Sequence, residues 1–331
     1  MKKKFFLPID SPEFICSHQL MFSNAILKAI AQEKTQILMC SKYINCYFRK
    51  DSVKNRFIIL MYDHWCTAQG FMQYQLIDFL KETYQKEKRN LVLTLKKCLL
   101  DGAYVFGQCN RAYIEEDVGT DAPLFDYVIT GFDDLAHEFT VYGMDSSENF
   151  SCYQVNDQKF VEALFHTPSA KIALTMWRHN QDAEISFDLP NIIFELEDYI
   201  HSVNNRNHYK ADKFYGLNAM KELSRHFYET AQSDCDLNES YLRKFLVHKA
   251  YMRDRIACLA SNGIIGEEWL TPADQVAKLG AEIFELGRNF NSLHDQALIE
   301  KLVEMITETT GLEADYLPKV LEELKTHHQT K

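Results

Sequence analysis

The character of the sequence changes near residue 205, and this change constrains the fold more than any other feature of the chain. Before this point, short runs of β-branched and aromatic residues alternate with helical patterns. After it, apolar residues recur at spacings of three and four, which is the periodicity of amphipathic helices. We therefore predict an α+β domain over residues 1–205 and an all-helical region over residues 206–331.

The clearest local pattern is an antiparallel β-hairpin. Residues 126–132 and 138–144 are rich in β-branched and aromatic side chains, and a polar turn that contains His137 separates them. A third run at 149–155 extends the hairpin into a meander. We therefore expect the α+β domain to be built on a central antiparallel sheet.

Weaker patterns predict the remaining elements. Further strands are expected at residues 56–62, 103–110, 171–177 and 185–189. Helices are expected at 20–30, from 75 onward, at 157–165, 214–230 and 239–260, from Thr271, and at 294–309 and 313–326. The C-terminal helices place their charged residues mainly on what would be the solvated face, so we interpret this region as an appendage without an active site.

Charge and cysteine content narrow the class of protein. The chain of 331 residues has a net charge of −11, which argues against binding to nucleic acid or anionic membranes, because both depend on Lys and Arg. The basic start at 1–4 is followed by too few apolar residues for a signal peptide, and no run approaches the ~18 apolar residues of a membrane span. The nine cysteines are scattered and form no CxxC pair, as expected for reduced thiols of a cytoplasmic protein.

Cys16 is the strongest candidate for a nucleophile. It lies where a polar segment that contains Pro12 turns into the helix predicted at 20–30. Unpaired N–H groups and the positive end of the dipole at a helix N-terminus favour a thiolate, and they lower the pKa of a thiol from ~8.5 towards roughly 3.5–7.5. The alternative is a small buried residue at the start of a core helix.

Four groups of residues occur in an informative order. They are 16–20, then 102–105 with 110–113, then 125–134 with 139–145, and finally 246–252 with 255–256. This set resembles stretches of papain-like domains related to the N-terminal domain of the butirosin biosynthesis acyltransferase, which are found beside non-ribosomal peptide and polyketide assembly lines. The resemblance extends over residues 5–260.

The resemblance implies a papain-like fold and acyl transfer in antibiotic biosynthesis. In such enzymes a cysteine takes an acyl group from a thioester on a phosphopantetheine carrier protein and passes it to a small amine, so that an amide forms without a further cofactor. Cys16 would be the nucleophile, and Asp145 would be the acid that orients the base. The implied partners are therefore an acyl or peptidyl carrier protein and an amine acceptor.

Two positions depart from the family pattern. The family has a histidine as base six residues before the hairpin glycine, where this chain has Phe125, and a glutamine that stabilises the oxyanion, where this chain has Asp10. Without a base, Cys16 lacks the partner that would take its proton. Three interpretations remain: an inactive relative, an enzyme with a relocated base, or a hairpin with a different alignment.

Two carboxylates of the hairpin offer one replacement for the missing base. If the strands pair regularly from Asp133 and Glu138 at the turn, Asp126 lies directly opposite Asp145. Facing carboxylates raise the pKa of one of them, which gives an acid–base pair. A change of register by one residue removes this pair, and the two residues are then solvated acids at strand ends.

Histidines offer further candidates. His64 is the second candidate base, and its neighbour Cys66 is an alternative nucleophile. His18 is two residues from Cys16, which is about 200° around a helix, so the two side chains should point apart. His248 lies on an apolar helix and is expected to be a hydrogen-bonded core residue.

Other chemistries have less support from the sequence. It contains no GxGxxG, GxxxxGK[ST], HExxH or GxSxG motif, and its histidines and acids show no metal-ligand spacing. We therefore predict a cysteine-dependent acyltransferase. The alternatives are a catalytically inactive relative that binds a carrier protein, peptide or product, and a peptidase or amidase that hydrolyses the acyl-cysteine.

Overall fold

The computed structural model describes residues 4–11, 18–41, 44–50, 55–59, 72–81, 88–115, 124–145, 150–180, 182, 186–205 and 213–330. Contacts between residues divide the chain into two compact units. The first unit comprises residues 1–13, 17–32 and 68–184, and the second comprises residues 14–16, 33–67 and 185–331.

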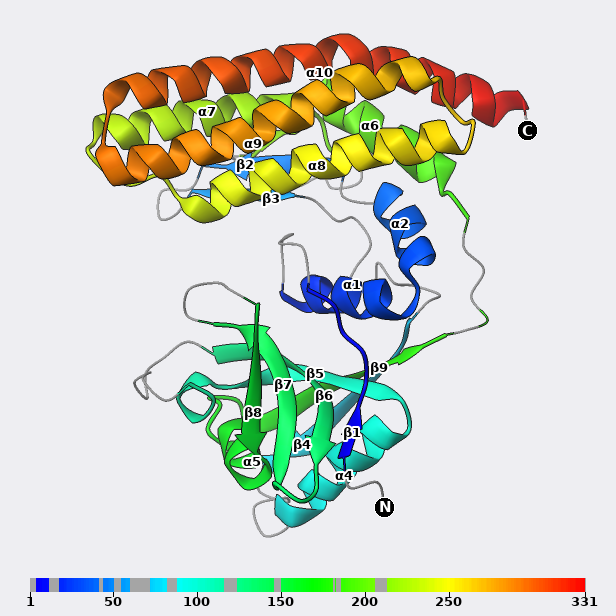
Figure 1. Ribbon diagram of the computed structural model, residues 1–331, viewed down its shortest axis with the longest axis vertical. Helices are drawn as coiled ribbons and strands as arrows, with labels where there is room; N and C mark the ends of the chain where they lie inside the picture. The colour runs from blue at the N-terminus through cyan, green and yellow to red at the C-terminus, as the bar shows by residue number, and fades with distance from the viewer. Residues whose placement is uncertain are drawn as a thin grey trace. The chain divides into compact units, whose positions relative to one another are not determined.

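The first unit is built on a seven-stranded antiparallel sheet (Figure 1). Its strands are β1 (Lys4–Phe6), β4 (Met72–Leu80), β5 (Ala103–Asn110), β6 (Leu124–Asp133), β7 (Glu138–Met144), β8 (Phe150–Asn156) and β9 (Lys171–His179). They lie in the order β4-β9-β5-β6-β7-β8, and β1 pairs with the C-terminal end of β6. The segment from β5 to β8 is therefore a meander, as predicted for its last three strands.

A β-bulge divides the long strand β6. On the turn side Gly131 pairs with Thr140, and on the far side Tyr127 pairs with Gly143, so Thr130 is an extra residue in β6. The predicted register at the turn is confirmed, but it holds only as far as the bulge. Beyond that point the partner of each β6 residue is shifted by one position, because the extra residue has no partner of its own.

Helices cover both faces of this sheet. Helices α4 (Lys88–Leu100) and α5 (Asp157–Phe165) pack on the face that carries Phe125, Tyr127 and Ile129, and they share one apolar core with it. Helix α1 (His18–Ile30) packs on the opposite face, where its Phe22 ring contacts Phe106 of β5 and Phe150 of β8. Successive residues of a strand point to opposite faces, so each central strand contributes side chains to both layers.

The second unit is mainly helical. Its helices are α2 (Gln32–Cys40), α6 (Leu189–His201), α7 (Gly216–Gln232), α8 (Glu239–Ser261), the short 3-10 helix η2 (Glu267–Trp269), α9 (Leu270–Leu293) and α10 (Gln296–Thr330). Its small sheet has the order β10-β2-β3, with β10 (Lys213–Tyr215), β2 (Cys46–Arg49) and β3 (Arg56–Ile59). One apolar core joins helices α6 to α10 with β2 and β3.

The two units do not follow the predicted division at residue 205. Residues 33–67 belong with the C-terminal helices, because Phe48 of β2 and Phe57 of β3 are buried in the helical core. The backbone of β2 also pairs with β10, which comes more than a hundred residues later in the chain. The protein is thus a mixed α+β chain with a central antiparallel sheet and a helical C-terminal region, to which an N-terminal segment contributes.

Several predicted elements have the predicted bounds. The strands at 103–110 and 138–144 and the helix at 157–165 are confirmed residue for residue. Helix α5 begins where predicted because the side chain of Asn156 accepts hydrogen bonds from the N–H groups of Gln158 and Lys159.

One predicted helix and one predicted strand are wrong. The region from residue 75 was predicted as a helix, but all nine residues of β4 pair with β9, so cross-strand pairing outweighs the helical spacing. The described residues of the strand predicted at 185–189 form no strand. They lead instead into α6, where the Asp188 side chain accepts a hydrogen bond from the N–H of Asn191 and caps the helix.

The last two predicted helices are one continuous helix. Helix α10 runs through Gly311 and Pro318 without ending at either. Its buried stripe continues on both sides of Gly311, for example at Ile306 and Leu317, and burial of this stripe outweighs the weak helix propensity of a single glycine. Helix α9 likewise starts at Leu270, directly after η2, rather than with a cap at Thr271.

Candidate functional site

Three of the predicted site residues cannot be placed. Cys16, His64 and Cys66 lie outside the described residues. The helix predicted at 20–30 is confirmed, and it begins two residues earlier than predicted, at His18.

An aromatic layer holds α1 on the sheet. The Phe22 ring, in the second turn of α1, lies 5.8 Å from the Phe106 ring of β5 and 5.9 Å from the Phe150 ring of β8. Phe106 in turn stacks on Trp177 at 5.2 Å, and Tyr142 stacks on Phe150 at the same distance. Phe22 is fully buried, so the first half of α1 has a fixed position over the middle of the sheet.

Asp126 lies on the face that α1 covers. Its neighbours Phe125 and Tyr127 belong to the core on the other face, and alternation places Asp126 opposite to them. The Asp126 Oδ1 atom accepts a hydrogen bond of 2.7 Å from Gln108 Nε2 across the β5–β6 pair. Gln108 is two residues beyond Phe106 on β5, so this polar pair lies one strand repeat from the ring that contacts Phe22.

The predicted facing pair of Asp126 and Asp145 is wrong. The bulge at Thr130 shifts the register by one residue. Tyr127, the neighbour of Asp126 in β6, therefore pairs with Gly143, whereas the regular register would pair it with Met144. Asp145 instead lies beyond the end of β7, where its Oδ2 atom accepts a hydrogen bond of 3.1 Å from the hydroxyl of Ser151. Ser151 alternates with Phe150, so this contact lies on the face away from α1.

Phe125 also points away from α1. It is fully buried in the core beneath α4 and α5, and its ring packs edge-on against Tyr153 at 5.6 Å. The Arg111 guanidinium lies over the same ring at 5.3 Å. A Cβ atom at Gly143 would approach the ring to 2.1 Å, so the glycine is required by the position of the ring. A histidine in place of Phe125 would therefore face a closed core and not the helix that follows Cys16.

A buried ion pair completes this side of the sheet. Arg111, in the short 3-10 helix η1 (Arg111–Tyr113), donates hydrogen bonds to Glu115 Oε1 at 3.3 Å and to the Met144 carbonyl at 3.2 Å. Glu115 Oε1 also accepts a hydrogen bond of 3.0 Å from the Tyr153 hydroxyl. Burial, together with this bond to Glu115, raises the pKa of Tyr153 to about 12. The cluster ties the end of β7 to the middle of β8.

Asp10 lies beside the middle of α1. Its N–H donates a hydrogen bond to the carbonyl of Ala25, and its carboxylate accepts one from the N–H of Ser11. The other carboxylate oxygen lies 4.0 Å from Lys28 Nζ, in the last turn of α1. The negative charge is thus directed towards the C-terminal half of the helix, away from the N-terminal N–H groups that would stabilise an oxyanion.

A second cluster of charged residues is buried in the helical unit. Lys249 of α8 and Glu313 of α10 are both fully buried, and Lys249 Nζ lies 2.6 Å from Glu313 Oε2. The Tyr199 hydroxyl of α6 donates to the same oxygen at 2.7 Å and accepts from Lys249 at 3.0 Å. Burial raises the pKa of Tyr199 well above its ordinary value, so the phenol keeps its proton. Lys249 and Glu313 are thus exceptions to the prediction that the charged residues of this region lie mainly on the solvated face.

The sequence contained a signal for these buried charges. Lys249 stands between Phe245 and Met252 at spacings of four and three, in the phase of the apolar face of α8. Glu313 occupies the same kind of position in α10, seven residues after Ile306. A charged residue in the apolar phase of a helix predicts a buried partner of opposite charge, because an unpaired buried charge is strongly unfavourable.

His248 is the buried core residue that the sequence predicted. Its side chain is fully buried, and Nε2 donates a hydrogen bond of 2.8 Å to the carbonyl of Ile44. Burial, followed by the charges of Lys249 and Arg255, lowers the pKa of His248 well below its ordinary value. The imidazole is therefore neutral and ties residue 44 to α8.

We expect the second unit to lose stability as the pH falls below ~6.5, the ordinary pKa of histidine. The unfolded chain then binds a proton that the folded His248 side chain rejects, so the free energy of unfolding falls by about 1.4 kcal/mol per pH unit. The variant His248→Gln keeps a donor for Ile44 and should reduce this slope, measured by urea denaturation between about pH 5 and about pH 7. Part of the slope should remain in this variant, because burial also lowers the pKa of His226.

The control for this pH dependence is His166→Gln. The His166 side chain is 52% exposed and belongs to the first unit, so this variant should leave the unfolding of the second unit unchanged. An equal slope in the wild type and in His248→Gln would contradict the assignment of His248 as a neutral buried group.

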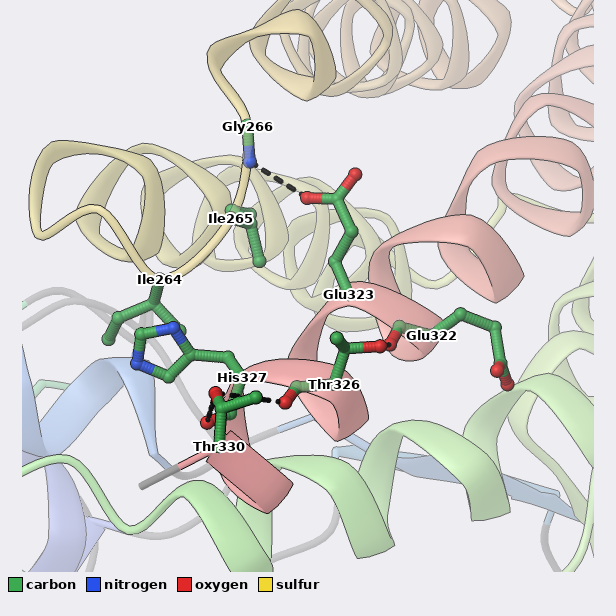
Figure 2. A pocket seen from close by; sticks show the side chains of 8 residues that line it. All are labelled: Ile264, Ile265, Gly266, Glu322, Glu323, Thr326, His327 and Thr330. Atoms are coloured by element: carbon green, nitrogen blue, oxygen red, sulfur yellow. Dashed lines mark hydrogen bonds between the residues drawn. The ribbon is translucent and has the colours of Figure 1, made fainter.

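An open pocket of about 490 Å³ lies at the C-terminal end of α10, within the second unit (Figure 2). It is lined by Ile264, Ile265, Gly266, Glu322, Glu323, Thr326, His327 and Thr330. Glu323 uses both oxygens within the fold, accepting from the N–H of Gly266 at 2.8 Å and from Trp269 Nε1 at 2.9 Å. Glu322 lies 3.5 Å from Lys325 Nζ. Glu323 thus stabilises the turn between α8 and α9, Glu322 pairs with a lysine of its own helix, and the two acids form no acid–base pair.

Comparisons with known proteins add no family to these observations. No protein-family model matches the chain, and a search of curated proteins finds no significant match. Among the described helices, none is long and apolar enough to cross a membrane. The described residues also contain no group of three or more His, Cys, Asp or Glu side chains arranged to hold a metal ion.

Proposed function

We propose that the protein is a papain-like, cysteine-dependent acyltransferase of the cytoplasm, in which Cys16 takes an acyl group from the thioester of a carrier protein and passes it to an amine. The observation that carries this proposal is the packing of α1, which begins two residues after Cys16 in the sequence, on one face of a central antiparallel sheet. A helix headed by the nucleophile and laid on an antiparallel sheet is the arrangement that the resemblance to papain-like domains implies.

The polar groups of that face support the same proposal. Asp126 and Gln108 form a hydrogen-bonded pair on the face covered by α1, whereas Asp145 and Phe125 lie on the other face. Asp126 is therefore the better candidate among the carboxylates for orienting a base, and the base comes from another residue, for which His64 remains the sequence-based candidate. This favours the interpretation that the hairpin is aligned differently from the family pattern.

The reaction has two stages. The Cys16 thiolate attacks the thioester carbonyl, the carbon–sulfur bond to the carrier breaks, and the carrier thiol leaves with a proton. An amine then attacks the acyl-cysteine, the amide bond forms, and the Cys16 thiol is restored. N–H groups at the start of α1 are free of intrahelical partners and would stabilise both tetrahedral states.

Acylation of Cys16 tests this proposal directly. We expect the wild type, mixed with synthetic acetyl-pantetheine thioester, to gain one acetyl group on the peptide that contains Cys16, as measured by intact-protein and peptide mass spectrometry. Cys16→Ala should abolish the adduct. Addition of a primary amine such as ethanolamine should discharge it to the amide, whereas a peptidase or amidase would discharge it to acetate without the amine.

Matched controls are available among the other thiols. Cys152 and Cys235 are exposed, so Cys152→Ala and Cys235→Ala report adventitious acylation of accessible cysteines and should leave the Cys16 adduct unchanged. The absence of an adduct on the wild type, or an equal adduct on Cys16→Ala, would refute the acyltransferase.

The second candidate is a catalytically inactive relative that binds a carrier protein, peptide or product. The burial of Phe125 beneath Arg111, at the position of the family histidine, is the observation that favours it. This candidate expects no acyl adduct on the wild type and equal binding of the acyl-pantetheine by the wild type and Cys16→Ala, which equilibrium dialysis would measure.

A further inference from the structure

Arg255 fixes the end of α2 on α8. Its guanidinium is almost fully buried, and it donates hydrogen bonds to the carbonyls of Cys40 at 2.7 Å and Met39 at 3.4 Å. The last carbonyls of a helix have no intrahelical donor and lie at the negative end of its dipole, so a buried cation there caps the helix. Cys40, the last residue of α2, is thereby held against α8.

Cys40 and Cys258 are neighbours in this arrangement. The Cys40 Sγ atom lies 4.0 Å from the carbonyl of Asp254, which stands one helical turn before Cys258 in α8. The Cys40 thiol thus lies beside the turn of α8 that carries Cys258, and each thiol shifts the pKa of the other. Both are free thiols, with Cys40 2% and Cys258 5% exposed. The fold therefore brings together two thiols that are more than two hundred residues apart in the chain.

We propose that Cys40 and Cys258 form a redox site, which a hydroperoxide converts to a disulfide between α2 and α8. The Cys258 sulfur attacks the terminal oxygen of the hydroperoxide, the O–O bond breaks, and a sulfenic acid forms while the remaining oxygen leaves as an alcohol or water after taking up a proton. The Cys40 thiol then attacks the sulfenic sulfur, the S–S bond forms, and water leaves with the thiol proton. The two sulfur atoms lose two electrons in total, and the hydroperoxide gains them.

The surroundings assign different roles to the two sulfur atoms. The neighbouring Cys40 thiol, and then the Arg255 guanidinium, lower the pKa of Cys258 below its ordinary value, although burial and Asp254 act in the opposite direction. The neighbouring Cys258 thiol, followed by burial, raises the pKa of Cys40. Cys258 is thus the thiolate that attacks first, and Cys40 keeps its proton until the second step.

Peptide mapping of the oxidised wild type tests this proposal without any substitution. The full chain is treated with hydrogen peroxide, the remaining thiols are blocked with N-ethylmaleimide in denaturant, and the protein is digested without reductant. We expect a linked peptide pair containing Cys40 and Cys258, lighter by two hydrogens than the free peptides and lost on reduction. Cys46 and Cys109, which are buried in other surroundings, should remain thiols and carry the maleimide.

Two variants separate the roles of the thiols. In Cys40→Ser the sulfenic acid of Cys258 should persist and be trapped by dimedone, whereas in Cys258→Ser Cys40 should stay unmodified. Full maleimide labelling of both Cys40 and Cys258 in the wild type, at peroxide concentrations that oxidise the exposed Cys152 and Cys235, would overturn the proposal. A linkage of either residue to Cys152 or Cys235 would overturn it as well.

Discussion

Replacing Lys249 with methionine is expected to lower the free energy of unfolding of the second unit by about 3–5 kcal/mol. The substitution keeps most of the side-chain volume but leaves the Glu313 carboxylate fully buried without its cation. The Tyr199 hydroxyl alone then satisfies Glu313 Oε2, and no described residue donates to Glu313 Oε1. Urea denaturation followed by far-ultraviolet circular dichroism measures the loss.

Two further variants make this result interpretable. Lys278→Met removes an exposed lysine of α9 that lies 3.9 Å from Glu282, and should change stability by less than about 0.5 kcal/mol. The double variant Lys249→Met/Glu313→Leu should recover a large part of the loss, because it removes the unpaired charge as well. A loss below about 1 kcal/mol for Lys249→Met would contradict the dry environment of this pair.

Phe125→Ala is expected to lower the free energy of unfolding of the first unit by about 3–5 kcal/mol. The ring fills the space between Tyr153, Arg111 and Gly143, and the glycine has no side chain that could fill the resulting cavity. The Arg111 guanidinium would also lose its contact with the ring face. Thermal and urea unfolding of the full chain measure the change.

An exposed leucine on the same hairpin is the matched control. Leu135, in the turn between β6 and β7, is 72% exposed, so Leu135→Ala should change stability by less than about 0.5 kcal/mol. Phe125→His adds a functional test, because position 125 faces away from α1 and a histidine there should not increase acylation of Cys16. A clear increase would mean that the family alignment of the hairpin is correct after all.

The sequence predicted local structure well where one pattern dominates. The runs of β-branched and aromatic residues predicted the meander, and apolar residues at helical spacing predicted α1. The capping residue Asn156 predicted the start of α5. The bulge at Thr130 could not be predicted, because an extra residue in a strand of continuous β-formers leaves no mark on the apolar pattern. That single residue changed the partner of Asp126 and thus the predicted acid pair.

Long-range partners were the part of the fold that local patterns could not supply. Phe48 and Phe57 are typical strand residues, and nothing in their own segment indicates that they pack on helices formed by residues far ahead in the chain. The buried pair of Lys249 and Glu313 did leave a trace, since both residues interrupt apolar stripes. Of the candidate site, the helix after Cys16 and the burial of His248 could be predicted from the sequence, whereas the face to which Phe125 points required the sheet.

The contribution of residues 33–67 to the helical unit affects how the protein folds during its synthesis. Strands β2 and β3 leave the exit tunnel well before α6 to α10, on which Phe48 and Phe57 are buried. At ordinary rates of translation this delay is on the order of ten seconds. During that interval an apolar hairpin precursor is available to chaperones and to other nascent chains, so the yield of native protein should depend on how quickly the last helices are made.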